Sequence, residues 1–480
     1  MDKQALLSYL DTEKERFFAF SDYIFDHPEL SLREFQAADR YETFLKNEGF
    51  TVEHGTAGIA TAFTASYGEG RPVIGILGEY DALDRLSQQS GVAEPCPLPG
   101  GGAGHGCGHN LLGAAALAAA CAVKEQLKQG GSGTVIFFGC PGEEGGSGKA
   151  FMARSGLFTR LDAAVTWHPS DCNEVVSGSC LASYQIEYTF EGIAAHAAGQ
   201  PYMGRSALDA VTLMNVGVQF LREHIPPHHG LHYAVTDTGG VSPNVVQPTA
   251  QVLYMLRSDN VPNIKKLAQQ VDDIARGAAL MTGTTLRRRF IDGTAETVPC
   301  AGLEKLAYEN LAALPLPEYT DEEWAFAAEL RKTYEADGLV SEAAKENPAV
   351  AAYVAEKSEN GKRALADFLV PLHHSSRIAA GSTDVGDVSH STPTVQFHVT
   401  TVPAGTPGHS WQQTAMGKTS IAKKGMLLAA KAMAGTVFDL LTQPDTLAAI
   451  QAEYEKDNTT GYVSPLEDGA VPTIPGKILP

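Results

Sequence analysis

The sequence has no excess of basic residues. Lys and Arg total 36 against 56 Asp and Glu, so the formal net charge is −20 at pH 7. Affinity for nucleic acid depends on basic side chains that neutralise phosphates, so a nucleic-acid partner is not expected. Hydrophobic residues make up 44% of the chain and charged residues 19%, which is typical of a protein with a large buried core and not of a disordered chain.

Long hydrophobic runs are also missing. The longest nearly unbroken run, Leu111 to Val123, is shorter than the ~20 residues that a helix needs to cross a bilayer. The N-terminal segment MDKQALLSYLDTEKERFFAF lacks the basic start, apolar stretch and cleavage site of a secretory signal. We therefore expect a cytoplasmic location and no membrane partner.

Cysteine is scarce and odd in number. The seven cysteines are scattered from Cys96 to Cys300 and do not form the dense, even set of a small disulfide-linked secreted domain. Most of them are expected to be reduced thiols in the core.

Hydrophobic patterns in the first part of the chain predict an α/β domain. Residues 4–25 have apolar positions at helical spacing, and the short apolar runs RPVIGIL, GTVIFFG and DAAVTW each end in a polar turn, with a helix over 111–129 between the first two. Alternating strands and helices predict a mainly parallel sheet with helices on both faces. In such sheets ligands bind beyond the carboxyl ends of the strands, where these polar turns lie.

A different order of elements predicts an inserted second domain over residues 183–298. Strand, helix, two strands, helix and strand follow one another there, the βαββαβ order of a compact α+β unit. Residues 1–182 and 299–480 would then form the first domain. An acidic, Ala- and Glu-rich stretch at about 315–370 is predicted to be a helical insertion into it, with solvated charged faces.

The strongest local chemical signal is the segment Gly104-His105-Gly106-Cys107-Gly108-His109-Asn110, directly before the apolar helix. Imidazole and thiol donors alternate with glycines that allow a tight fold, so several donors could converge on one metal ion. Two alternatives stay open at this point. The segment could be a glycine-rich turn with incidental histidines, or Cys107 could be a hydrolytic nucleophile activated by a histidine.

Three further predicted strand ends and loops carry candidate ligands. Glu143 and Glu144 follow one strand, and their mutual repulsion makes the pair costly unless a cation or a proton resolves it. His168 ends another strand, and His409 lies in Gly405-Thr-Pro-Gly-His-Ser-Trp411. Taken singly, Glu143-Glu144 could be a solvated acidic turn, and each histidine is more often a structural residue than a ligand. Their common placement at one edge of the predicted sheet favours a site.

In order along the chain, five motifs resemble those of the M20 metallopeptidase and aminoacylase family. They are Gly78-Glu79-Tyr80-Asp81-Ala82-Leu83, His105-x-Cys107-Gly108-His109-Asn110, Glu143-Glu144, Gly192-x-x-Ala195-His196-Ala197 and Gly405-Thr-Pro-x-His409. The cysteine-containing amidohydrolase branch of the family fits best. The similarity runs nearly end to end and includes GRSALDAVTLM, GGVSPNVVQ, STDVGDVS and TSIAKKGMLLAAK. An ordered series of motifs is far more specific than any one of them.

The resemblance implies a site for two divalent metal ions in each subunit. Cys107 would bridge the ions, where the wider family more often has Asp. His109 and His168 would complete the ligands of one ion, and Glu144 and His409 those of the other. Thiolate, imidazole and carboxylate donors together suit zinc, while carboxylate and water ligation also suit manganese, so the metal is expected to be Mn²⁺ or Zn²⁺.

The resemblance also implies roles around the metal. Glu143 would be the general base for a metal-activated water, and Asp81 would orient a ligand. His196 would stabilise the developing oxyanion, and in related enzymes the corresponding histidine comes from the partner subunit, so a homodimer is expected. Arg257 could hold a substrate carboxylate by bidentate contacts, assisted by Asn244. A surface ion pair is the alternative for Arg257, and a helix-capping turn residue is the alternative for His196.

The function predicted from these residues is metal-dependent hydrolysis of the amide bond of an N-acyl amino acid. An aryl-acyl substrate of the aminobenzoyl-glutamate type ranks first, and indole-acyl or N-acetyl amino acids and dipeptides are alternatives. A non-catalytic binding or regulatory subunit that retains the fold is the rival from another class. Besides the small-molecule substrate and a second copy of the chain, a related second subunit is a candidate partner. Arg205, His228 and His229 rank lower as site residues, because the direction of their loops is not evident from the sequence.

Overall fold

The computed structural model describes residues 1–336, 338–458 and 461–474. The other positions of the predicted domains lie outside the described residues. The chain divides into two compact units. Unit 1 comprises Met1–Ser179, Val298–Arg377 and Val388–Tyr462, and unit 2 comprises Cys180–Thr297, Ile378–Asp387 and the residues from Val463. Two segments that lie outside the predicted insertion, 378–387 and the residues from 463, thus pack with unit 2.

Unit 1 contains a seven-stranded sheet with the order β1-β2-β4-β3-β5-β13-β6. The four neighbouring strands β4, β3, β5 and β13 are parallel, while β1, β2 and β6 join the two edges in antiparallel pairs. The strand bounds are β1 (Thr51–His54), β2 (Phe63–Glu69), β3 (Val73–Glu79), β4 (Gly133–Cys140), β5 (Ala163–Ser170), β6 (Glu174–Val175) and β13 (Thr394–Thr400). The predicted fold class, an α/β domain with a mainly parallel sheet and helices, is confirmed.

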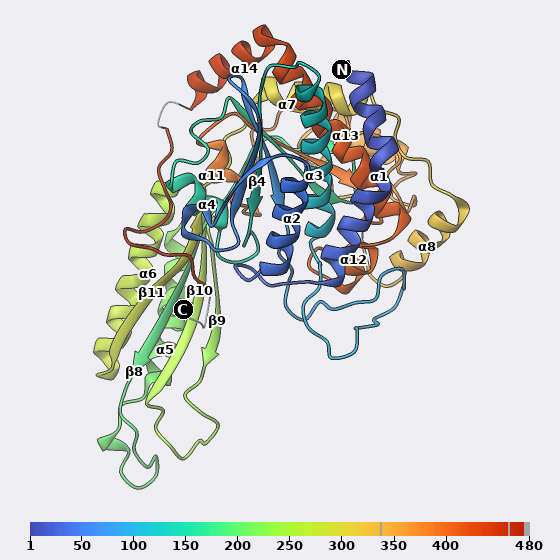
Figure 1. The fold of residues 1–480 in the computed structure, drawn as a ribbon. Coiled ribbons are helices and arrows are strands. Elements are labelled where there is room, and N and C mark those ends of the chain that lie inside the picture. Colours follow the sequence, from blue (N-terminus) through green and yellow to red (C-terminus); the bar gives the residue numbers. More distant parts are fainter. Residues whose placement is uncertain (337, 459–460, 475–480) are drawn as a thin grey trace. The chain divides into compact units, whose positions relative to one another are not determined.

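The helices of unit 1 include those predicted over residues 4–25 and 111–129. Their bounds are α1 (Lys3–Asp26), α2 (Phe35–Asn47), η1 (Thr56–Gly58), α3 (His109–Lys128), α4 (Gly148–Arg154), α7 (Ala301–Ala312), α8 (Asp321–Arg331), α9 (Glu342–Glu346), α10 (Pro348–Lys357), α12 (Trp411–Met416), α13 (Ser420–Thr442) and α14 (Pro444–Asp457). The Ala-rich α3 is buried along almost its whole length, because small side chains let α1 and α13 lie closely alongside it (Figure 1). Burial of α3 anchors its N-terminus, where the candidate metal ligands begin.

One helix among the described residues, α13, is long and apolar enough to cross a membrane. However, 78% of its most apolar window is buried inside the protein. Its side chains Met426, Ala429 and Met433 belong to the core of unit 1. A single buried helix of this kind is weak support for a membrane span.

The stretch predicted as a helical insertion contains α8, α9 and α10. A capping box starts α8, since Thr320 and Glu323 each bond the backbone N–H of the other. The helices pack in two small apolar clusters that are separate from the main core, one of which includes Val350 and Val354. The helical character expected for this stretch is therefore present, while α7 before it is part of the main core through Leu303 and Leu311.

Unit 2 has the βαββαβ order predicted from the sequence. Its elements are β8 (Ala182–Glu191), η2 (Pro201–Met203), α5 (Ala207–Leu221), η3 (Arg222–His224), β9 (Gly230–Asp237), β10 (Thr249–Ser258), α6 (Val261–Thr282) and β11 (Thr285–Thr294). The sheet is antiparallel with the order β11-β8-β10-β9 (Figure 1). Buried and partly exposed residues alternate strictly along β10, because α5 and α6 cover one face of the sheet. Short elements at the unit boundaries are β7 (Ser179–Cys180), β12 (Ile378–Ala379) and α11 (Val385–Ser389).

Candidate metal centre

Three neighbouring parallel strands deliver the candidate residues to one edge of the unit 1 sheet. The register pairs Glu79 at the end of β3 with Cys140 at the end of β4, so the turns after these strands start at the same level. Asp81 lies in the first turn and the Glu143-Glu144 pair in the second, while His168 lies near the end of β5. Parallel pairing of the strands therefore brings together residues that are far apart in the sequence.

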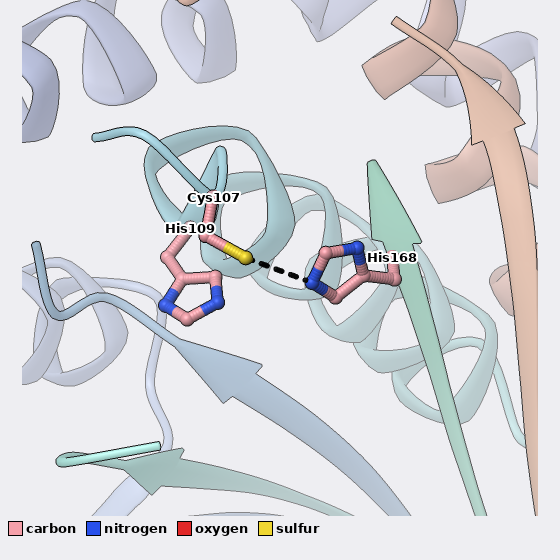
Figure 2. A group of neighbouring side chains, drawn as sticks. All are labelled: Cys107, His109 and His168. Atoms are coloured by element: carbon pink, nitrogen blue, oxygen red, sulfur yellow. Dashed lines mark hydrogen bonds between the residues drawn. The ribbon is translucent and has the colours of Figure 1, made fainter. Parts of the chain in front are cut away.

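The glycine-rich segment places Cys107 and His109 beside His168. Gly108 has φ +78°, a left-handed conformation that turns the chain into α3, and a side chain there would meet Pro169 at 3.0 Å. Cys107 Sγ lies 3.3 Å from His168 Nε2, and His109 projects from the first turn of α3 next to them (Figure 2). One donor atom from each of the three residues lies within 4.8 Å of the others.

A second group of donors shares Cys107. Glu144 Oε2 lies 3.3 Å from His409 Nε2, and both residues have a donor atom within 4.8 Å of Cys107 Sγ. The backbone N–H of His409 donates to Gly106 O at 3.1 Å, which ties the His409 loop to the Cys107 loop. The structure thus arranges the five predicted ligands as two groups of three with a thiol in common, the same partition that the family resemblance implies.

Two buried atoms in these groups are left without a hydrogen bond. His109 Nε2 and Glu144 Oε1 are inaccessible to solvent and make none to any described residue, although they lie 3.9 Å from each other and His109 Nε2 lies 3.4 Å from Glu79 Oε2. An unpaired buried polar atom is costly, so such atoms in a functional site point to a missing partner. A cation fits here, because ligand atoms about 2.0–2.3 Å from one ion in a tetrahedral site are roughly 3.3–3.8 Å apart. The observed separations of 3.3 Å fall in this range.

Asp81 contacts one residue of each donor group, His109 and Glu144. Its Oδ1 lies 2.8 Å from His109 Nδ1, and its Oδ2 accepts hydrogen bonds from Ser31 Oγ at 2.7 Å and from the backbone N–H of Glu144 at 3.0 Å. Burial alone would raise the pKa of Asp81, but the hydrogen bond and charge of His109 outweigh it and hold the pKa below its usual range. Asp81 therefore remains a carboxylate that orients one ligand side chain and the backbone of another.

Glu143 lies beside Glu79 and His109. A carboxylate oxygen of Glu143 is within 4.8 Å of donor atoms of Glu79 and His109. Glu79 in turn forms a fully buried ion pair with Lys149, with 2.7 Å between Oε1 and Nζ. The Lys149 charge compensates part of the negative charge that collects here.

The acid–base states of the site differ from those of free side chains. Burial raises the pKa of the Cys107 thiol, the opposite of what an activated cysteine nucleophile requires. The hydrogen bond to Glu144 raises the pKa of His409, and although burial would raise the pKa of Glu144, its contacts with His409 and His109 lower it. A bound metal cation would take the place of the protons on the Cys107 thiol and on His409.

The residues predicted on unit 2 lie in two places within that unit. Asn244 and His196 are neighbours, because Ala197 N donates to Asn244 O at 2.9 Å and His196 pairs with Val245 across a short bridge. His196 Nδ1 accepts hydrogen bonds from the backbone N–H groups of two residues of its own loop at 3.2 Å. It does not cap α5, whose cap is Ser206, so the helix-cap alternative is wrong.

Arg257 lies at the end of β10 and is partly buried. Its Nη1 donates to Ser382 Oγ, and burial lowers the pKa of its guanidinium. Arg205 instead holds its own loop, donating to the carbonyl oxygens of Tyr202 at 3.2 Å and Gly204 at 2.6 Å.

The sequence-based prediction left three buried residues near the centre without a role. Glu79 and Lys149 form the ion pair described above, and Glu34 bonds the turn that carries Glu143. Glu79 stands inside the quoted Gly78–Leu83 motif, and a carboxylate two positions before Asp81 was the available signal. The sequence around Glu34 and Lys149 gives no such signal, because their partners Gly142 and Glu79 lie far away along the chain.

Comparison with known proteins agrees with the geometry. Peptidase family M20/M25/M40 matches residues 75–443. One subunit of the p-aminobenzoyl-glutamate hydrolase of Escherichia coli (strain K12) is 44% identical over 474 residues, covering 97% of both chains. The Xaa-Arg dipeptidase of Mus musculus is 27% identical over 471 residues, covering 94% of this chain and 92% of the dipeptidase.

A solved structure shares the fold. It is that of a dinuclear metal-binding peptidase of the M20 family from Bacillus subtilis, which aligns with a TM-score of 0.54 and 17% identity over 90% of this chain and 99% of that chain. The family match over most of the chain and the 44% identity to a relative of nearly equal length leave one assignment: the chain belongs to the M20/M25/M40 peptidase family and is a hydrolase of that family.

Proposed function

We propose that this hydrolase is a metal-dependent amidohydrolase that cleaves the amide bond of an N-acyl amino acid, with p-aminobenzoyl-glutamate as the first substrate to test. The substrate proposal rests on the 44% identity to a relative that is named as part of a p-aminobenzoyl-glutamate hydrolase. The proposal of metal dependence rests on one observation, the two donor groups that share Cys107 Sγ and leave His109 Nε2 and Glu144 Oε1 without a hydrogen bond to any described residue.

Five residues would hold two divalent ions, Mn²⁺ or Zn²⁺. Cys107, His109 and His168 would bind one ion, and Cys107, Glu144 and His409 the other. Bound ions would supply Lewis acidity for the amide carbonyl and lower the pKa of water in the site from about 15.7 toward about 7. The described geometry supports this ligand set, and metal analysis tests it.

Glu143 is proposed as the general base. Its carboxylate, beside Glu79 and His109, would accept a proton from the attacking water and then pass it to the departing amine nitrogen. Asp81 would hold His109 in one tautomer with Nε2 directed at the donor group. Glu143 is thus assigned the proton transfer, while Asp81 keeps His109 in position.

Residues of unit 2 are proposed to bind the substrate. Arg257 would hold the free carboxylate of the amino-acid part through its guanidinium, and Asn244 would donate to the same group or to the amide carbonyl. His196 of the partner subunit would stabilise the oxyanion, which makes a homodimer part of the proposal. We further propose a cytoplasmic location, and a related second subunit as an additional partner, since the relative from Escherichia coli is named as one subunit of its hydrolase.

The test is a hydrolysis screen on the purified full chain after chelation and after addition of Mn²⁺ or Zn²⁺. The panel should include p-aminobenzoyl-glutamate, an indole-acyl amino acid, an N-acetyl amino acid and an Xaa-Arg dipeptide. We expect p-aminobenzoyl-glutamate to be cleaved fastest and only in the metal-loaded protein. Preferred cleavage of the dipeptide would favour the activity named for the mouse relative, and ligand binding without turnover of any substrate would favour a non-catalytic subunit.

A further inference from the structure

Unit 2 contains a second group of metal-ligating side chains that the proposed function does not use. His228 and His229 lie between η3 and β9, and Asp259 follows β10 directly. His229 Nε2 lies 3.3 Å from Asp259 Oδ1, and His228 Nε2 lies 3.6 Å from Asp259 Oδ2. The three donor atoms lie within 4.8 Å of one another, so both imidazoles face one carboxylate.

The contacts are longer than a good charge-assisted hydrogen bond, which spans about 2.7–2.9 Å. Two ligand atoms that are about 2.0–2.1 Å from one tetrahedral zinc ion are roughly 3.3–3.4 Å apart, which the His229 contact of 3.3 Å matches and the His228 contact of 3.6 Å slightly exceeds. The carboxylate has further contacts, since Asn263 Nδ2 donates to Asp259 Oδ1 at 2.8 Å and Ser258 Oγ lies 3.1 Å from the same oxygen and 3.1 Å from His229 Nε2. Outer donors of this kind fix the orientation of a metal-binding carboxylate.

We propose that His228, His229 and Asp259 bind one divalent transition-metal ion, zinc first. Two imidazoles and one carboxylate suit zinc and leave a fourth coordination position. The side chain of His229 is 6% exposed and that of His228 is 51% exposed, so the group is anchored on one side and open to water on the other. The ion links the connection before β9 to the start of α6, a structural role separate from the chemistry at Cys107.

The test counts zinc ions bound to the full chain. Metal-free protein is titrated with Zn²⁺ and analysed by elemental analysis for the wild type, the double variant His228→Ala/His229→Ala, the variant Asp259→Asn and the control His232→Ala. His232 is an exposed histidine on the neighbouring β9 strand and is not part of the group. We expect both group variants to bind one ion fewer per chain than the wild type and the control.

An equal number of ions in all four proteins overturns the proposal. Cobalt substitution identifies the ion that is lost, because only a site with a thiolate ligand shows a sulfur-to-cobalt charge-transfer band. That band should persist in the group variants. Its absence from every protein would count against the proposed centre at Cys107, while the loss of one ion in the group variants would still support the site in unit 2.

A second inference concerns the hydrogen bonds of Glu34 in unit 1. Glu34 precedes α2 and is fully buried. Its Oε1 accepts hydrogen bonds from the backbone N–H groups of Leu32 at 2.8 Å and Gly142 at 2.9 Å, and its Oε2 accepts one from Thr61 Oγ1 at 2.9 Å. A single side chain therefore bonds three segments.

The contact with Gly142 bears on the metal centre. Gly142 starts the turn that leads to Glu143 and Glu144, and its φ of +68° is a left-handed conformation that a bond to the peptide N–H helps to hold. The other end of the turn is held by Asp81, which accepts from the N–H of Glu144 at 3.0 Å. Two buried carboxylates on different segments thus fix the two ends of a three-residue turn.

We infer that Glu34 is a positioning residue that aims Glu143 and Glu144, an inference that rests on the proposed function of those two residues. Replacement by Gln keeps an oxygen for the two N–H groups and lets the amide donate to Thr61 Oγ1. Replacement by Ala removes the acceptor and leaves two buried N–H groups unsatisfied. The two substitutions therefore separate the loss of the hydrogen-bond acceptor from the loss of the ionisable group.

The experiment compares Glu34→Ala, Glu34→Gln and the control Thr61→Val, which keeps both backbone contacts of Oε1. We expect Glu34→Ala to lower kcat and metal affinity by about 10–100-fold with little change in KM, and the other two to stay near the wild type. Wild-type metal affinity in Glu34→Ala, or an equal loss in Glu34→Gln, overturns the inference. Metal affinity is measured without substrate, so the inference can be judged even if the chain cleaves none of the tested amides.

Discussion

His109 Nδ1 lies 2.8 Å from Asp81 Oδ1, and both side chains are completely buried. With Nδ1 engaged by the carboxylate, Nε2 is the ring nitrogen left to face the donor groups of Cys107 and Glu144. The contact joins the end of β3 to the first turn of α3, and it is one of three by which Asp81 holds the centre.

Replacement of Asp81 by Asn should weaken metal binding by about 10–100-fold, because the amide cannot replace a charged partner that fixes the tautomer of His109. Ser31→Ala is the matched control, since it removes a different bond to Asp81 and leaves His109 in place. Dissociation constants from competition with a chromophoric chelator measure the effect. Equal affinities of the two variants would show that the His109 contact does not orient a ligand.

Glu143→Gln should abolish most turnover while metal content and substrate binding stay unchanged. A general base typically contributes about 10²–10⁴-fold to a rate, and Gln keeps the size of the side chain without its basicity. Single-turnover kinetics, elemental analysis and substrate titration should be carried out on the same sample. A variant that retained the wild-type kcat would remove Glu143 from this role.

Cys107→Asp should retain metal and some activity, whereas Cys107→Ala should lose both, because a carboxylate can bind divalent ions as the thiolate does. In the unsubstituted protein, bound metal should protect Cys107 from alkylation, as followed by mass spectrometry of the modified peptide. A cysteine hydrolase would behave in the opposite way, with activity that survives chelation and is lost on alkylation of Cys107.

The pH dependence of stability should carry a contribution from Glu34. Burial, and then the negative charge of Asp81, raise the pKa of Glu34 from 4.5 to about 8 in the folded chain. The folded state therefore binds more protons than the unfolded state between these values, and this contribution to stability falls as the pH rises. Melting temperatures of the chelated wild type should decline relative to Glu34→Gln from about pH 4.5 to about pH 8. Parallel curves for the two proteins would contradict the raised pKa.

Lys149→Met should destabilise the chain by about 3–5 kcal/mol, because it leaves the buried Glu79 carboxylate without its cation. Denaturant unfolding measures the loss. Lys332→Met is the control, since Lys332 pairs with Glu329 on an exposed helix face and contributes little. Adding Glu79→Gln to Lys149→Met should recover part of the lost stability, and no recovery would place the cost elsewhere.

The arrangement of the elements followed from local patterns in the sequence. The apolar runs before Gly78, Glu143 and His168 form β3, β4 and β5. Strands of a parallel sheet are buried on both faces, so they occur in the sequence as short, nearly continuous apolar runs. The βαββαβ order of unit 2 was predicted in the same way, whereas the start of α6 at Val261 is seen only in the structure. Asn260 caps the helix there, because its side chain accepts a hydrogen bond from the backbone N–H of Asn263.

The candidate ligands and the orienting residue Asp81 were also predicted, but the other buried residues that support the site, Glu34, Glu79 and Lys149, were not. Cys107, His109 and Glu144 stand in short motifs whose residue types allow metal binding, and the resemblance to the M20 family assigns them as ligands. Glu34 and Lys149 carry no such signal, because a buried charge is informative only when its partner is known.

By itself, the sequence determined the elements of this protein, its family and the identity of the candidate ligands, since these depend on residue type and on spacing along the chain. Only the tertiary structure decided the distances between the donor atoms around Cys107, the lack of hydrogen bonds at His109 Nε2 and Glu144 Oε1 among the described residues, and the approach of His228 and His229 to Asp259. The physical reason is that coordination and burial are set by distances between segments, and such distances arise when strands pair and helices pack.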